Sequence, residues 1–199
     1  MDENATADNA FARLVSLACH DLRTPLATVV GFAHTLTRQG GLEEPASRYV
    51  EMIGAAAEQL GELVDELSLG ARIEAGRYDP VLREVDTLEL ARGAVERLGE
   101  ERVVIEGTGA TVELDVDSTD RAVGALTQCA LRHGGLEQVR LDVRGAELTL
   151  TPVTPASAPV LLGEDLRDLG AAIAVLAIRA QGGEVTLAGE ELHVRLPGS

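Results

Sequence analysis

Two long stretches of helical apolar spacing open the sequence, and they limit most strongly what it can fold into. Apolar residues recur every three or four positions from about Asn9 to Arg38, and again from about Ala46 to Ala75. The segment QGGLEEP between them supplies a helix stop and a short turn, so the two helices should form an antiparallel hairpin. A lone hairpin leaves part of each apolar stripe uncovered. We therefore expect two copies to pair as a homodimeric four-helix bundle.

From Tyr78 onward the pattern changes to short strand-like and helical pieces. REVD, RVVIEG and TVELDVD are typical of strands, and LEQVRLDVRG with AELTLTP and the final GGEVTLAGEELHVRLP are typical of hairpins. Helices are expected after REVD, over STDRAVGALTQCALRH with Ser118 as its cap, and from about Asp165 to Gln181. This order favours a two-layer α/β sandwich. The predicted fold class is thus α plus α/β, with a hairpin over residues 1–77 and a sandwich over residues 78–199.

The charge balance excludes several classes of partner. The chain has 33 acidic and 17 basic residues and a formal net charge of −16, which would repel nucleic acid and anionic membrane surfaces. The sequence has an acidic beginning and no apolar run of membrane-spanning length, so we expect neither signal peptide nor membrane anchor, and a cytoplasmic location. Cys19 and Cys129 lie far apart and make no CxxC or Cys/His metal pattern, so no metal site is expected.

His20 lies on the wrong side of the first helix for a core residue. At about 100° per residue it projects away from the stripe that passes through Ala18 and Leu22, toward solvent. His34 falls on the same outward face about four turns later. Unlike His20, it has no adjacent carboxylate in the sequence, so we interpret it as an ordinary surface histidine.

The residues around His20 suggest chemistry rather than structure. Asp21 follows directly, and a carboxylate beside an imidazole can fix its tautomer and raise its basicity, which makes the free nitrogen a nucleophile. Arg23 and Thr24 lie one turn on. Pro25 removes a backbone hydrogen bond to the carbonyl of Asp21, at a cost of about 3 kcal/mol in a helix interior. A helix that keeps such a defect beside an exposed His/Asp pair indicates a functional site.

The segment HDLRTPL resembles the H-box of two-component histidine kinases of the dimerisation and phosphotransfer type, and LVDELSLGARIEAG in the second helix is similar to the same family. The resemblance covers roughly the first eighty residues. It implies that His20 carries a phosphoryl group with Asp21 as its acid/base partner. It also implies that Thr24 positions water to dephosphorylate a partner, and that Arg23 and Pro25 shape the face on which that partner docks.

The second half resembles the ATP-binding domain of these kinases only in outline. Cys129 stands where the family places an asparagine that holds Mg²⁺, and LTLTPVTPASAPVLLG lacks the Asp-x-Gly-x-Gly motif expected to read adenine. Of the glycines expected before the lid helix only Gly170 is kept, and Asp168 stands where another would be. The resemblance therefore implies a degenerate domain that binds no ATP and no cofactor of its own. Mg²⁺ would come with the receiver domain of the partner.

Taken whole, the chain resembles the degenerate histidine kinases that act as histidine phosphotransferases in phosphorelays. We expect an enzyme that relays a phosphoryl group through His20 to and from the receiver aspartates of response regulators, without ATP-dependent autophosphorylation. Two alternatives stay open: an autophosphorylating kinase with a divergent nucleotide site, and a non-catalytic dimeric docking module that sequesters a response regulator. A phosphatase activity that uses Thr24 is compatible with the phosphotransferase interpretation.

Overall fold

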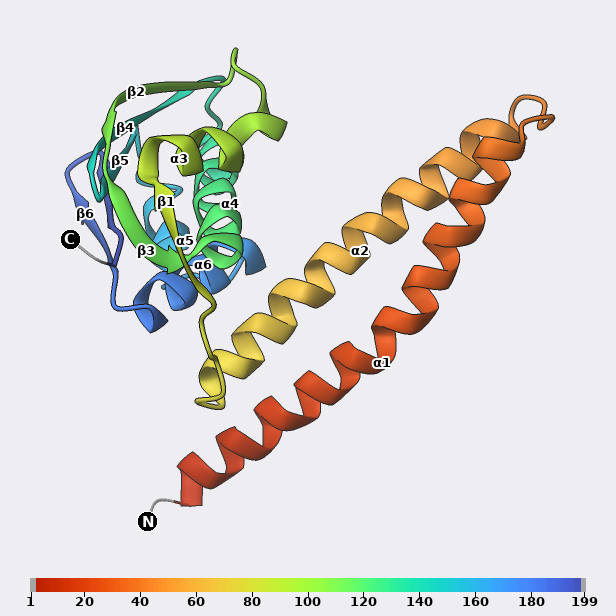
Figure 1. Ribbon diagram of the computed structural model, residues 1–199, viewed down its shortest axis with the longest axis horizontal. Coiled ribbons are helices and arrows are strands. Elements are labelled where there is room, and N and C mark those ends of the chain that lie inside the picture. Colours follow the sequence, from red (N-terminus) through yellow and green to blue (C-terminus); the bar gives the residue numbers. More distant parts are fainter. Residues whose placement is uncertain (1–2, 198–199) are drawn as a thin grey trace. The chain divides into compact units, whose positions relative to one another are not determined.

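The computed structural model describes the backbone of residues 3–197 and the side chains of residues 11–197 (Figure 1). The chain divides into two compact units, Met1–Arg77 and Tyr78–Ser199. The first is an antiparallel helical hairpin and the second contains all the strands, which confirms the predicted fold class at the level of one chain. In the part of the chain that the structure describes, every helix is too short or too polar to cross a membrane.

The hairpin consists of α1 (Glu3–Gln39), which runs through Pro25, and α2 (Ala46–Glu74). Small residues mark the seam where the helices approach. A Cβ added at Gly54 would lie 3.4 Å from the Cβ of Ala33, which is close packing between the two helices. Buried or half-buried residues recur at intervals of seven along α1, a spacing that keeps one face of a helix against its neighbour. They are Ala12, Cys19, Leu26 and Ala33.

The larger apolar residues of the hairpin lie outside this seam. They occupy a second stripe on each helix, roughly a quarter-turn round at 100° per residue. Their exposed fractions lie between 40% and 68%. We call this surface the open apolar face, and its residues are Phe11, Leu14, Leu22, Val29, Phe32 and Leu36 on α1 with Tyr49, Met52, Ile53, Leu60, Leu63 and Leu67 on α2.

The second unit is a sandwich of helices on one face of a five-stranded sheet (Figure 1). The strand order is β2-β4-β5-β7-β6, and β1 pairs with β3 in a separate two-stranded sheet. All pairs are antiparallel except β2 with β4, which run parallel. The strands are β1 (Leu82–Asp86), β2 (Val103–Gly109), β3 (Thr111–Asp115), β4 (Val139–Gly145), β5 (Glu147–Thr151), β6 (Glu184–Ala188) and β7 (Glu191–Arg195). The helices are α3 (Thr87–Val95), the 3₁₀ turn η1 (Glu96–Leu98), α4 (Val116–Gly134), α5 (Ala158–Leu161) and α6 (Leu169–Ala180).

The core of the sandwich is aliphatic and fully enclosed, in contrast to the hairpin. It lies between the sheet and the helices α3, α4 and α6, and the partly buried residues at its edge close it further. Its largest enclosed side chains include Leu114, Leu126, Leu148, Leu150, Ile178 and Leu192. Aliphatic burial at about 25 cal/mol per Å² is therefore the main source of stability in this unit.

Two helix starts differ from the sequence prediction. The cap of α4 is Asp115 rather than Ser118: its carboxylate accepts from the backbone N–H of Ser118 at 3.0 Å, and the buried Ser118 hydroxyl has no hydrogen-bond partner among the described residues. An aspartate at the end of β3 satisfies the first turn better than a hydroxyl already inside the helix. Likewise α6 begins only at Leu169, because Asp168 is its cap.

Candidate functional site

His20 projects from α1 into solvent, with 76% of its side chain exposed. Its Nδ1 lies 3.1 Å from Oδ1 of Asp21, whose side chain is 70% exposed. A carboxylate oxygen accepts hydrogen bonds, so Nδ1 holds the proton in this contact and Nε2 carries the lone pair. The pair thus presents one imidazole nitrogen, oriented by a carboxylate, to whatever approaches the helix from solvent.

The other predicted site residues lie on the same two turns of α1. Thr24 and Pro25 are exposed, and the carbonyl of Thr24 accepts a hydrogen bond from the Thr28 hydroxyl at 3.0 Å. The guanidinium of Arg23 donates from Nε to Oδ1 of Asp65 on α2, at 2.8 Å. Asp65 was not predicted, because it is 42 residues away in sequence and no local pattern connects it to Arg23.

Leu17 is a further residue that sequence analysis missed. It precedes His20 by one turn, lies outside the open apolar face, and is 58% exposed. A large apolar side chain one turn from His20 adds exposed apolar area to this part of α1. Leu17 was overlooked because it belongs to neither apolar stripe.

The prediction for His34 needs a correction. His34 does have a carboxylate partner: its Nε2 lies 2.9 Å from Oε1 of Glu58 on α2. Sequence analysis considered only neighbours along the chain, whereas the hairpin brings the second helix alongside. Because both side chains are more than half exposed, the pair is a surface contact of modest strength.

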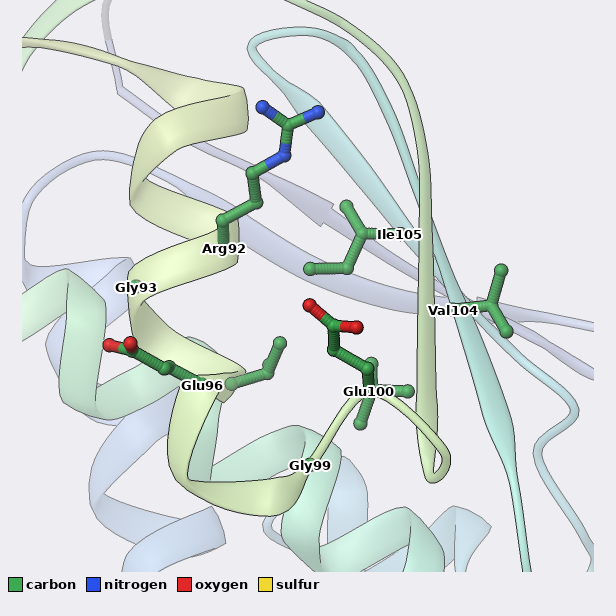
Figure 2. A pocket seen from close by; sticks show the side chains of 9 residues that line it. Arg92, Gly93, Glu96, Gly99, Glu100, Val104 and Ile105 are labelled. Atoms are coloured by element: carbon green, nitrogen blue, oxygen red, sulfur yellow. The ribbon is translucent and has the colours of Figure 1, made fainter.

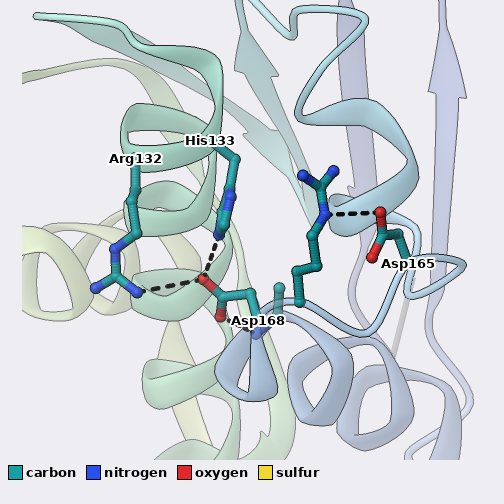
Figure 3. A network of polar contacts seen from close by, with 6 residues as sticks. Arg132, His133, Asp165 and Asp168 are labelled. Atoms are coloured by element: carbon teal, nitrogen blue, oxygen red, sulfur yellow. Dashed lines mark hydrogen bonds and ion pairs between the residues drawn. The ribbon is translucent and has the colours of Figure 1, made fainter.

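In the sandwich, the predicted nucleotide region centres on Asp168. Its Oδ1 accepts the backbone N–H of Ala171 at 3.1 Å and so caps α6. Its Oδ2 accepts from His133 Nε2 at 3.0 Å and lies 3.5 Å from Arg132, both on α4 (Figure 3). The side chain of Asp168 is only 11% exposed, so this carboxylate is an integral part of the contact between α4 and α6.

These residues do not fit an ATP–Mg²⁺ site. A triphosphate needs free backbone N–H groups at a helix N-terminus, and at α6 a carboxylate already accepts one and adds a negative charge. Cys129 is fully buried, and burial together with the nearby Asp168 charge raises the pKa of its thiol to about 12. A neutral thiol is a poor ligand for Mg²⁺, which prefers oxygen.

The sandwich also has a pocket of about 590 Å³ between α3, η1 and β2 (Figure 2). The side chains of Ile105, Arg92 and Glu100 point into it, whereas those of Val104 and Glu96 project away from it (Figure 2). The pocket therefore presents one carboxylate and one guanidinium. It is built from different elements than the Asp168 network.

Comparison with known proteins places these features in context. Residues 12–76 match the family described as the His Kinase A (phospho-acceptor) domain. The chain is 31% identical over 93 residues to sensor protein DivL of Caulobacter vibrioides, which covers 47% of this chain and 12% of DivL. It is 28% identical over 172 residues to histidine protein kinase DivJ of the same organism, which covers 80% of this chain and 28% of DivJ. The chain thus spans less than a third of the length of these curated relatives.

Two solved structures share the fold along most of the chain. Full-length ShkA, crystallised in complex with AMPPNP, aligns with 94% of this chain and 47% of its own, at a TM-score of 0.65 and 21% identity. The Acinetobacter baumannii histidine kinase AdeS aligns with 89% of this chain and 96% of its own, at a TM-score of 0.56 and 18% identity. The sandwich therefore resembles a kinase ATP-binding domain in fold, although its residues depart from a nucleotide site. Residues 12–76 thus match a phospho-acceptor domain of histidine kinases, and the chain as a whole is similar to histidine kinases in sequence and in fold.

Proposed function

We propose that the protein is a homodimeric histidine phosphotransferase that exchanges a phosphoryl group between His20 and the receiver aspartates of response regulators, without making phosphohistidine from ATP. The observation that carries the proposal is the solvent-exposed pair of His20 with Asp21, at 3.1 Å. The Asp168 carboxylate, which already accepts a backbone N–H in the first turn of α6, supports the statement that phosphohistidine is not made from ATP.

The chemistry follows from the orientation of the imidazole. The lone pair on Nε2 of His20 attacks the phosphorus of a receiver aspartyl phosphate, an N–P bond forms, and the acyl phosphate P–O bond breaks. The electron pair of that bond stays on the receiver carboxylate. The ring becomes cationic, and Asp21 stabilises it through the Nδ1 proton. The reverse reaction at a second receiver returns His20 to its neutral form. Mg²⁺ held by the receiver would neutralise the phosphoryl oxygens during transfer.

The surface around His20 supports docking of a second protein domain. The exposed side chains of Leu17, Thr24 and Pro25 lie within about one and a half turns of His20. Arg23 is held by Asp65 and keeps 46% of its side chain exposed, so its charge stays at the same surface. A receiver that carries a phosphorylated aspartate would find an apolar contact, a cation and the nucleophile on one helix.

The open apolar face supports the homodimer. Twelve large side chains between 40% and 68% exposed would otherwise remain in contact with water along both helices. Monomeric proteins rarely expose continuous apolar surface of this extent. Pairing two hairpins through this face buries it and leaves His20 outside, since His20 projects away from that stripe.

The test is transfer of labelled phosphate from a phosphorylated receiver domain to the purified protein. The label should move to the chain as an acid-labile, base-stable phosphohistidine. His20→Ala should abolish transfer, whereas His34→Ala should retain it. The two histidines make a matched comparison because each is exposed and each has a carboxylate partner. Equal behaviour of the two variants would refute the assignment of His20 and leave the docking module as the better reading.

A true kinase is the second candidate, since the family assignment and the ShkA fold both include nucleotide-binding relatives. Calorimetric titration with ATP and Mg²⁺ separates the two. We expect no heat of binding, because the Asp168 carboxylate occupies the first turn of α6. A micromolar dissociation constant would favour autophosphorylation.

Thr24→Ala should leave transfer to His20 intact and reduce any phosphatase activity toward the receiver.

A further inference from the structure

Three potential metal ligands meet at the contact between α4 and α6. The Sγ of Cys129, a ring nitrogen of His133 and a carboxylate oxygen of Asp168 all lie within 4.8 Å of one another. Cys129 is fully buried, and the side chains of His133 and Asp168 are 20% and 11% exposed. Sequence analysis missed this cluster because Asp168 is distant in sequence and because Cys129 and His133, at a spacing of four, form no CxxC-type motif.

We propose that Cys129, His133 and Asp168 form a binding site for a borderline divalent cation, of which Zn²⁺ is the natural example. Thiolate, imidazole and carboxylate are the three protein ligand types that Zn²⁺ binds. Cys129 would therefore release its thiol proton to solvent when the metal binds, which makes the affinity pH-dependent. Mg²⁺ and Ca²⁺ take oxygen ligands and would be disfavoured by sulfur and nitrogen. The donor set therefore selects a different class of metal from the one that accompanies a nucleotide.

The backbone geometry suits such a site. Cys129 and His133 are separated by four positions on α4, so they lie on one face of the helix and project in the same direction. Asp168 caps α6 through Oδ1, so Oδ2 can act as a ligand without loss of the cap. A metal would replace the proton that Oδ2 now accepts from Nε2 of His133. Ligand atoms in a tetrahedral zinc site lie about 3.4 Å apart at metal–ligand bonds of about 2.0–2.3 Å. The ring nitrogen of His133 and Oδ2 of Asp168, 3.0 Å apart, would have to separate slightly. Atoms of the cluster that lie up to 4.8 Å apart would have to approach one another.

Arg132 is a built-in competitor for this metal. Its guanidinium lies 3.5 Å from the same oxygen, Oδ2 of Asp168, that faces His133. A cation between these ligands would meet the positive charge of Arg132, unless that side chain turned outward. Arg132 is 58% exposed, so it can do so. Removal of this charge should therefore tighten metal binding, whereas a cluster held only by hydrogen bonds would gain nothing from its removal.

The test uses Co²⁺ as a spectroscopic probe for Zn²⁺, on the purified, reduced chain. Binding through Cys129 should produce a sulfur-to-cobalt charge-transfer band in the near ultraviolet, with one Co²⁺ per chain, and Zn²⁺ should displace it. Cys129→Ser should abolish the band, and the control Cys19→Ser should keep it. His133→Gln should weaken binding by more than about 100-fold, because even the loss of outer-shell partners costs 10–100-fold. Arg132→Gln should strengthen binding.

The outcomes are distinguishable. Since Cys129 is enclosed in the core, its variant could unfold, and His133→Gln at a partly exposed position provides the independent check. Absence of a charge-transfer band in the folded wild-type chain, or a band that survives Cys129→Ser or disappears in Cys19→Ser, would overturn the proposal. In that case the cluster is a purely hydrogen-bonded contact between α4 and α6. None of these measurements depends on phosphotransfer, so the result stands apart from the function of His20.

Discussion

The hairpin and the sandwich distribute their apolar residues in opposite ways. In the hairpin the seam consists of small residues such as Gly54 and Ala33, while Leu60 and Phe32 stay more than half exposed. In the sandwich the large residues are enclosed: Leu126 is 2% exposed and Leu148 is 1% exposed. The sandwich is therefore complete as one chain, whereas the hairpin carries a surface that calls for a partner.

The charged groups follow the same division. In the hairpin, the pair of His20 and Asp21 is open to solvent and available for reaction. In the sandwich, the pair of His133 and Asp168 is largely buried and joins two helices. Similar chemical groups at similar distances are thus exposed to solvent in one unit and join two helices in the other.

The largest expected effect is on the rate of phosphoryl transfer, and it should distinguish the carboxylate of Asp21 from that of Asp168. Asp21→Asn should slow phosphoryl transfer by about 10²–10⁴-fold, because it removes the acid/base partner of the imidazole while preserving side-chain size. Asp168→Ala should leave the transfer rate unchanged and lower the free energy of unfolding by about 0.5–2 kcal/mol, the usual cost of a lost helix cap. Single-turnover transfer kinetics and urea denaturation measure the two quantities. If Asp168→Ala slowed transfer as much as Asp21→Asn, the functional division between the units would be wrong.

Truncation of one leucine in each unit tests whether the sandwich core is complete within one chain while the hairpin packs against a second chain. Leu126→Ala should destabilise the sandwich by about 2–5 kcal/mol, independently of protein concentration. Leu60→Ala should weaken association of the hairpins, so its effect should grow on dilution. Denaturation at two protein concentrations, with light scattering for the mass, measures both. A wild-type chain that is monomeric at micromolar concentration would show that the open apolar face does not make a dimer.

The smallest expected effect comes from a partly buried charge in the sandwich. Burial is the main cause that raises the pKa of Asp120, with Asp117 acting in the same direction and Arg97 and Arg121 opposing it. The folded state therefore binds a proton more readily than the unfolded state, and stability falls as the pH rises through this window above 3.8.

Asp120→Asn should accordingly stabilise the sandwich at neutral pH, and the gain should vanish as the pH falls to the ordinary aspartate value. Asp165→Asn is the control, since Asp165 is not among the charges that act on Asp120 and pairs with Arg167 at 2.7 Å. Thermal melting over a pH series measures the difference. A gain for Asp120→Asn that persists unchanged in acid would mean that burial of its charge is not the cause.

Periodicity in the sequence was sufficient to predict the longer elements of both units, whereas the short α5 and η1 were not predicted. The spacing of apolar residues predicted α1 and α2 within a few residues, apart from the earlier start of α1, and alternation predicted the hairpins β4–β5 and β6–β7. The parallel pairing of β2 with β4 was not foreseen, because strand direction depends on how the intervening α4 packs and not on the strand residues.

The site residues that escaped prediction are those whose partners are remote in sequence. Arg23 finds Asp65, and His34 finds Glu58, only because the hairpin folds back on itself. Which residue caps a helix depends on where the backbone leaves the preceding strand and becomes helical. The N-cap of α4 is therefore Asp115 and not the expected Ser118. Local chemistry such as the adjacent pair of His20 and Asp21 is legible in the sequence, whereas contacts between elements require the fold.

The carboxylate at the start of α6 also has a metabolic consequence. Asp168 is an anion tethered to the chain, so its effective concentration at the helix N-terminus is fixed by geometry and does not vary with the cell's pool of soluble anions. A kinase that must collect its nucleotide from solution senses changes in the ratio of ATP to ADP. Under the proposed function without ATP binding, a sandwich that carries its own anion is insulated from that ratio, and its conformation should be the same in starved and in growing cells.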